Sequence, residues 1–141
     1  MAFPPNASKL AAYRSASAHA GVDAADPHRL VVMLMDGALE RIATARGLMS
    51  NGTGGAERAQ LLHRAVAIID ELRNSLNFKS GELAHNLDAL YEYMCTRLMQ
   101  ASASNKPEWL DEVSRLLNEI RSAWLQLPAQ GRAQVAQRCV A

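Results

Sequence analysis

Glu82 and His85 are the residues whose types and spacing come nearest to a metal-binding motif. They form an E-x-x-H pattern, which places a carboxylate and an imidazole on one face of a helix. Four-helix bundles that hold two iron ions use two such pairs and two further inward-facing carboxylates. The sequence has no second copy, and an acid at a helix start is favourable for electrostatic reasons alone. We therefore predict no metal site. Metal analysis of the purified protein would test the alternative, a helical metalloenzyme.

The other candidate ligands and nucleophiles are scattered along the chain. His19, His28 and His63 share no ligand-like spacing, and Cys95 and Cys139 belong to no C-x-x-C pair. The glycines fall in loop-like clusters and form no phosphate-binding motif. No set of residues suggests catalysis, so we predict that the protein is not an enzyme and needs no cofactor.

Composition and charge narrow the function further. The chain has 141 residues, with 15 basic and 14 acidic side chains and a net charge of +1. The basic residues form no stripe, so we predict no nucleic-acid partner. No apolar run has the length of a signal peptide or of a membrane span, so we expect a cytoplasmic protein without membrane insertion.

Helix signals divide the sequence into four long segments. Asp26 followed by Pro27 is typical of a helix start, and Pro107 opens another helix with acidic residues in its first turns. The predicted helices run from Pro27 to the Ser50–Gly55 cluster, over 56–77, over 82–103, and from Pro107 to before Pro128. Their lengths and short connections predict an all-α protein, an antiparallel up-down four-helix bundle over residues 26–128.

The two ends of the chain have a different composition from the bundle. Residues 1–25 begin with Phe3-Pro4-Pro5 and hold few large apolar groups, so we expect a mobile arm with a short helix that docks through Leu10 and Tyr13. Residues 129–141 form a tail that could contain a short, weakly held helix.

Apolar residues at three- and four-residue steps predict the buried face of each helix. Leu83, Leu87, Leu90 and Met94 recur in this way and are expected to share one face. The helices carry more methionine and aromatic side chains than a minimal core requires. Such side chains either widen the core or, where they stay accessible, form an adaptable groove for an apolar helix. The pattern leaves both interpretations open.

The charged residues suggest pairs within single helices. Asp36 has Arg41 near it in sequence, and Asp111 and Arg115 have the favourable four-residue order. We expect such pairs to lie on the solvent-exposed faces of the helices.

Several short runs follow one another in a fixed order along the chain: DPHRLVVMLMDG at 26–37, AVAIIDEL at 65–72, GELAHNL at 81–87, LYEYM at 90–94, WLDEV at 109–113 and the segment 121–124. From about Tyr13 to Leu127 these runs resemble the FliS family of flagellar export chaperones. No single run is diagnostic, but their order and spacing together are specific.

The resemblance implies an antiparallel helical bundle that binds the C-terminal segment of flagellin. That segment would be disordered when free and would fold around the bundle, which prevents premature polymerisation and keeps flagellin competent for flagellar type III secretion. The resemblance also makes the export gate and flagellar regulators candidate partners. A different class of function, a self-associating structural bundle without flagellin binding, is the alternative.

The partner-binding residues follow from the apolar faces and the resemblance together. We predict that the third helix lines the groove, that the fourth helix supports it, and that Tyr13 anchors the arm. The predicted partner-binding residues are Tyr13, Tyr91, Met94, Leu98, Val113, Ile120 and Trp124. Each of these side chains also fits a role in the core.

Overall fold

The computed structural model describes residues 26–126, so the predicted arm over 1–25 and the chain from residue 127 onward lie outside the described region. The described elements are α2 (Pro27–Ser50), α3 (Gly55–Asn74), the short 3₁₀ helix η1 (Phe78–Ser80), α4 (Glu82–Ser104) and α5 (Pro107–Leu125).

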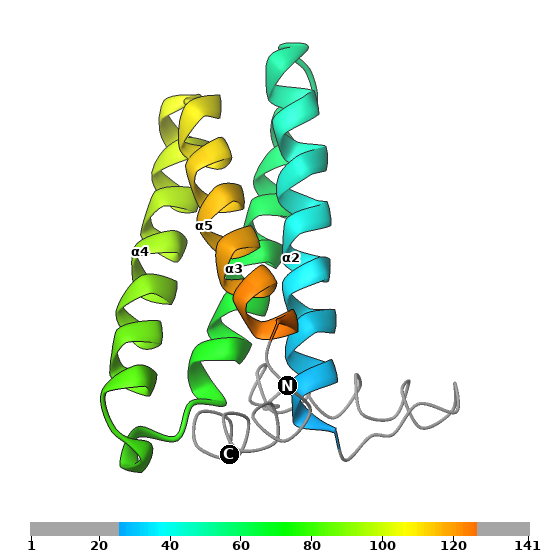
Figure 1. The fold of residues 1–141 in the computed structure, drawn as a ribbon. Coiled ribbons are helices and arrows are strands. Elements are labelled where there is room, and N and C mark those ends of the chain that lie inside the picture. The colour runs from blue at the N-terminus through cyan, green and yellow to red at the C-terminus, as the bar shows by residue number, and fades with distance from the viewer. Residues whose placement is uncertain (1–25, 127–141) are drawn as a thin grey trace, which may run out of the picture.

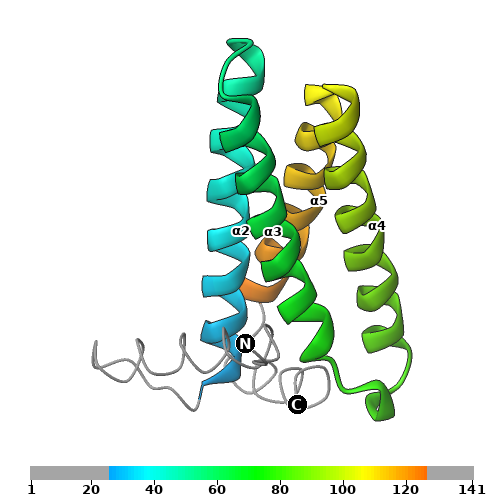
Figure 2. The ribbon, with the colours of Figure 1, turned by 180° about the vertical axis from the view of Figure 1, so that it is seen from behind.

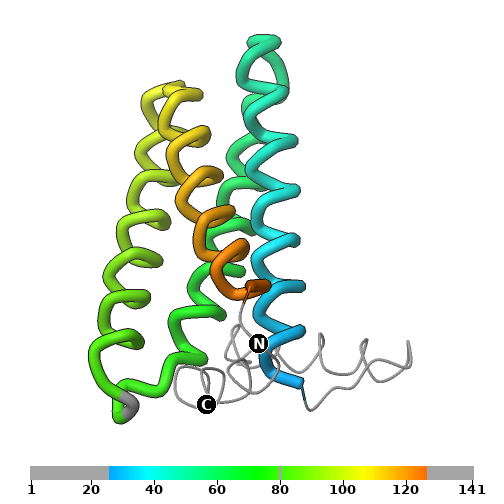
Figure 3. The backbone as a smooth tube through the Cα atoms, viewed as in Figure 1, coloured from blue at the N-terminus to red at the C-terminus, as the bar shows by residue number. Residues whose placement is uncertain are grey.

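The four long helices run alternately up and down around one core (Figure 1). α2 packs against α3 and α5, and α4 packs against the same two helices, with the α4–α5 contact the least extensive. The view from behind shows the same order (Figure 2). The backbone tube shows that the described chain begins and ends towards the same end of the bundle (Figure 3). The predicted antiparallel four-helix bundle is confirmed.

The start of α2 is fixed by its local sequence. The Asp26 carboxylate accepts hydrogen bonds from the backbone N–H groups of His28 at 3.1 Å and Arg29 at 3.4 Å. Pro27 occupies the first turn, where its missing N–H has no cost. A cap of this kind stabilises a helix by about 1 kcal/mol. These contacts explain why this boundary could be predicted.

The connection from α3 to α4 differs from the prediction. The helix predicted to continue to Asn77 ends at Asn74, and the Ser75 hydroxyl donates to the Glu71 carbonyl at 2.8 Å. The apolar pattern runs on because Leu76 still packs into the core from outside the helix. Gly81, with φ of 106° and ψ of −155°, then adopts a backbone conformation essentially restricted to glycine and redirects the chain into α4.

The core is one continuous cluster that all four long helices supply. On α4 it takes Leu87 and Met94, but Leu83 and Leu90 remain 49% and 38% exposed. The expectation that these four residues share a buried face is therefore only half right. The buried residues of α4 are Ala84, Leu87, Tyr91, Met94, Leu98 and Ala101.

Asp36 and Asp111 pair with residues of another helix, where partners within their own helix were expected. Asp36 pairs with Arg121, and Arg41 instead donates to the Gly37 carbonyl at 2.9 Å. Asp111 pairs with Arg46 at 3.0 Å. The prediction that Asp36 pairs with Arg41 and Asp111 with Arg115 is wrong. Each acid lies where α2 packs against α5, and its partner is on the opposite helix, distant in sequence.

Candidate partner-binding site

The structure places most of the predicted partner-binding residues in the core. Tyr13 lies outside the described residues. Ile120 is half-buried at the edge of the core. The five others are buried: Tyr91, Met94, Leu98, Val113 and Trp124. Their role in binding a partner stays a prediction, and in this conformation they pack against other core residues.

Several large apolar side chains that the predicted set omitted are exposed. On α4 these are Leu83, Leu90, Tyr93 and Met99, with Phe78 just before the helix. Periodicity alone could not separate them from core residues, because Leu83 and Leu90 follow the same spacing as buried Leu87 and Met94.

A polar clasp joins α4 to α5 near the loop that connects them. Arg97 Nε donates to the Tyr93 hydroxyl at 3.0 Å and to Glu112 Oε1 at 3.1 Å, and the Tyr93 hydroxyl donates to Glu112 Oε2 at 2.9 Å. The Arg97 guanidinium also lies 4.6 Å from the centre of the Trp109 ring, a cation–π distance. The hydrogen bond to Tyr93 is the largest cause that raises the pKa of Arg97, so the Arg97 guanidinium stays positively charged.

The other half of α5 is tied to α2. Arg121 Nε lies 2.6 Å from Asp36 Oδ1. Trp124, about one turn after Arg121 on α5, contacts the buried His28 of α2. His28 Nε2 lies 2.9 Å from the Trp124 carbonyl oxygen, and the two rings stack with 5.7 Å between their centres. α5 is therefore bonded to α4 near its start, where Asp111 also pairs with Arg46 of α2, and to α2 again near its end.

The E-x-x-H residues have no metal-binding arrangement. Among residues 26–126, no three histidine, cysteine or acidic side chains come together in a group that could hold a metal ion. His85 instead packs its ring against Phe78, 5.0 Å between ring centres. This contact gives the imidazole a local packing role at the start of α4.

Cys95 is unsuited to act as a nucleophile. Burial is the largest cause that raises its pKa to about 12, with the charge of Asp70 next. Its Sγ lies 3.8 Å from both the Val66 carbonyl and Asp70 Oδ1. The side chain is therefore a protonated thiol at neutral pH.

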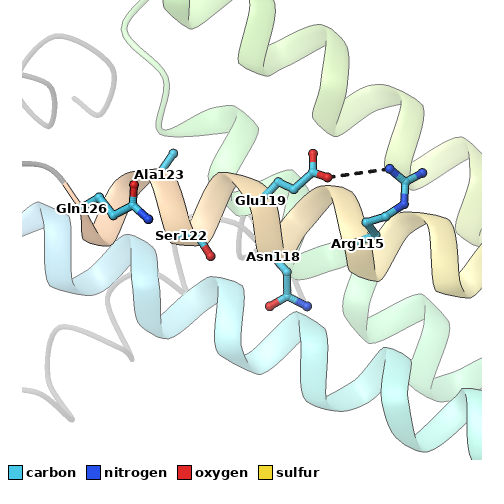
Figure 4. A pocket seen from close by; sticks show the side chains of 6 residues that line it. All are labelled: Arg115, Asn118, Glu119, Ser122, Ala123 and Gln126. Atoms are coloured by element: carbon cyan, nitrogen blue, oxygen red, sulfur yellow. Dashed lines mark ion pairs between the residues drawn. The ribbon is translucent and has the colours of Figure 1, made fainter.

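One open depression lies on the outer face of α5 (Figure 4). Its described lining is Arg115, Asn118, Glu119, Ser122, Ala123 and Gln126. Arg115 and Glu119 form an exposed ion pair at 3.7 Å. The lining comes from one helix, and all of its residues except Ala123 have polar side chains, so it resembles the rim of a contact surface more than an enclosed ligand pocket.

None of the described helices combines the length and the apolar character needed to cross a bilayer.

Comparison with known proteins points to one family. The family model for the flagellar protein FliS matches residues 9–131. The flagellar secretion chaperone FliSB of Pseudomonas aeruginosa is 49% identical over 113 residues, which cover 79% of this chain and 89% of the relative. The flagellar secretion chaperone FliS of Vibrio cholerae is 38% identical over 122 residues, 86% of this chain and 89% of the relative. The flagellar secretion chaperone FliS of Salmonella typhimurium is 38% identical over 130 residues, which cover 91% of this chain and 96% of the relative.

Proposed function

The chain belongs to the FliS family of flagellar secretion chaperones, and we propose that its client is the C-terminal segment of flagellin. The observation that carries this proposal is the family match over residues 9–131. The chaperone binds that segment before secretion, prevents its premature polymerisation and keeps flagellin competent for flagellar type III secretion.

Helix-in-groove recognition provides the physical basis of this function. A client segment that is disordered when free loses conformational entropy when it folds on a partner, so it needs apolar surface to offset that cost. A bundle with partly exposed leucine, methionine and tyrosine side chains on one helix can supply such surface. Ile120 is the predicted binding residue that remains partly accessible on α5.

The buried members of the predicted set bind less directly. The buried residues lie beneath the groove and contact the client where it displaces surface side chains; they are Tyr91, Met94, Leu98, Val113 and Trp124. We propose Tyr13 as a further client contact; it lies outside the described residues.

The same proposal places the protein in the cytoplasm, where unassembled flagellin must be kept from polymerising. It acts by binding and without catalysis. The export gate and flagellar regulators are further proposed partners, because a client-loaded chaperone must hand its cargo to the secretion machinery.

Binding to full-length and C-terminally truncated flagellin tests the proposal. Titration calorimetry should give tight one-to-one binding with the full-length protein and none with the truncated one. Equal binding to both would overturn the proposal. Sedimentation at micromolar concentration tests the less favoured alternative, which requires a stable homodimer that flagellin leaves unchanged.

A further inference from the structure

The outer side of the contact between α3 and α4 carries a partly accessible apolar strip. Cys95 of α4 lies against α3, with its Sγ 3.8 Å from the Val66 carbonyl oxygen. The Cys95 and Val66 side chains are both half-buried. Met99 follows Cys95 by four positions, about one helical turn, and is 39% exposed. The strip therefore offers apolar surface on the α3 side of α4.

A charge cluster continues this strip towards the start of α4. Arg73 of α3 contacts Asp88 Oδ1 at 2.9 Å, Glu92 Oε2 at 3.7 Å and Asp70 Oδ1 at 4.0 Å. One guanidinium therefore faces three carboxylates. In every other ion pair of the described chain, one arginine faces one acid. We call the apolar strip and this charge cluster together the α3–α4 seam.

The surplus negative charge of the seam is accessible to solvent. The side chains of Glu92 and Asp70 are 66% and 42% exposed. Burial is the largest cause that raises the pKa of the Cys95 thiol, and the carboxylates of Asp70 and Glu92 raise it further against the opposing charge of Arg73. The negative potential therefore extends from the cluster into the apolar strip. A segment that fits the seam needs an apolar side chain beside a cation.

The end of this chain has the matching chemistry. Residues 127–141 contain Arg132 and Arg138 and no aspartate or glutamate. Val135 precedes Arg138 by three positions, so in a helix the two side chains share one side. The segment therefore combines an apolar group with positive charge, complementary to the seam.

The segment is also long enough to reach the seam. The last turns of α5 and α3 and the first turn of α4 lie towards one end of the bundle (Figure 1). Packed helices are about 8–10 Å apart, so the outer side of the seam is about 25 Å from the end of α5. The twelve positions from Gln126 to Arg138 span up to about 40 Å when extended. The segment can therefore cross the end of the bundle and still contact the charge cluster.

We propose that the segment 132–138 of this chain docks on the α3–α4 seam, with Val135 against the apolar strip and Arg138 against Glu92 and Asp70. The contact supplies the positive charge that Arg73 alone does not balance. Because the seam is exposed to solvent, the attraction is screened by salt and the docked segment is in equilibrium with a released form.

The seam is separate from the exposed leucines of α4. Glu92 is two positions from Leu90, which places it about 200° further around the helix. Release of the segment therefore leaves Leu90 unchanged, and variants of the seam should bind flagellin as the wild type does.

Zero-length crosslinking of the full chain identifies the acid that the segment contacts. The Arg138→Lys variant keeps the positive charge and supplies an amine, which a carbodiimide couples to a carboxylate in direct contact. Mass spectrometry of the monomer should find position 138 joined to Glu92, Asp70 or Asp88. Links confined to other acids, links between two copies, or no link at position 138 would overturn the proposal.

Trypsin cleavage after Arg132 measures docking in the chain with its native arginines. Glu92→Gln combined with Asp70→Asn removes the surplus charge and should speed this cleavage at least threefold. Glu119→Gln is the matched control, because it removes an exposed acid that pairs with one arginine, and it should leave the rate unchanged. Salt at 0.5 M should speed cleavage of the wild type towards the rate of the double variant. Equal rates in the double variant and the control would contradict docking on the seam.

Discussion

Asp36 on α2 and Arg121 on α5 are joined by a 2.6 Å contact between Oδ1 and Nε, across 85 positions of sequence. Together with the His28–Trp124 contact, this pair holds the second half of α5 against α2 and away from α4. The position of α5 sets which apolar residues of α4 are covered.

Asp36→Ala should destabilise the bundle by about 0.5–1 kcal/mol, the upper part of the range for partly exposed pairs. Urea unfolding measures the change. Glu119→Ala is the control, because it removes the more exposed pair with Arg115 and should cost less than about 0.5 kcal/mol. Equal losses would mean that the α2–α5 pair has no special role.

His28→Ala should cost about 1–2 kcal/mol, because it removes a buried hydrogen bond to the Trp124 carbonyl and a ring contact. Hydrogen exchange should show faster exchange in the last turn of α5. The exposed His63 on α3 provides the control, and His63→Ala should leave both stability and exchange unchanged.

Arg97→Lys should loosen the clasp while it keeps the charge, because lysine lacks the planar group that contacts both Glu112 and the Trp109 ring. In a Trp124→Phe background, Trp109 is the single tryptophan and its emission should shift to longer wavelength. Arg115→Lys should cause no such shift, and a shift of the same size there would contradict the clasp assignment.

Met94→Ala should lower the free energy of unfolding by about 2–5 kcal/mol, because Met94 is fully buried. Met99→Ala on the same helix is partly exposed and should stay within about 0.5 kcal/mol of the wild type. If Met94→Ala instead left the stability unchanged and abolished flagellin binding, Met94 would belong to the groove.

Cys95 should react slowly with iodoacetamide in the folded chain. Burial raises the pKa of its thiol from 9.0 to about 12, so the reactive thiolate is about a thousandfold rarer at pH 8. A Cys139→Ser variant isolates this thiol, and its alkylation should accelerate on unfolding in urea.

The raised pKa also means that Cys95 favours folding below pH 9 and that this contribution is lost as the pH rises from 9 towards 12. A folded chain alkylated as fast as the unfolded one would contradict the burial of Cys95.

The sequence predicted the helices better than the surface. Asp26-Pro27 and Pro107 set helix starts through local contacts, so these boundaries could be found from neighbouring residues. Leu90 and Leu87 could not be separated in this way, because their exposure depends on where α5 crosses α4. That crossing depends on Arg121 and Asp36, whose pairing no local pattern indicates.

The same distinction applies to the candidate site. The sequence identified α4 as the helix with surplus apolar side chains, and the structure places its accessible leucines at positions 83 and 90. Tyr91, one position further on, turns inward because each helical position advances about 100° around the axis. Met94, four positions further on, lies only about 40° from Leu90, so the boundary of the buried face falls between these two residues.

The contact between His28 and the Trp124 carbonyl brings the first turn of α2 next to the last turn of α5, so the described bundle is nearly a closed ring. A short linker from Gln126 to Asp26 would complete that ring. The exposed turn between α2 and α3, at Gly52–Gly54, could then be opened to create new termini. The order in which the helices are connected is therefore separable from their packing, and a rearranged chain should retain the same four-helix core with both former ends joined.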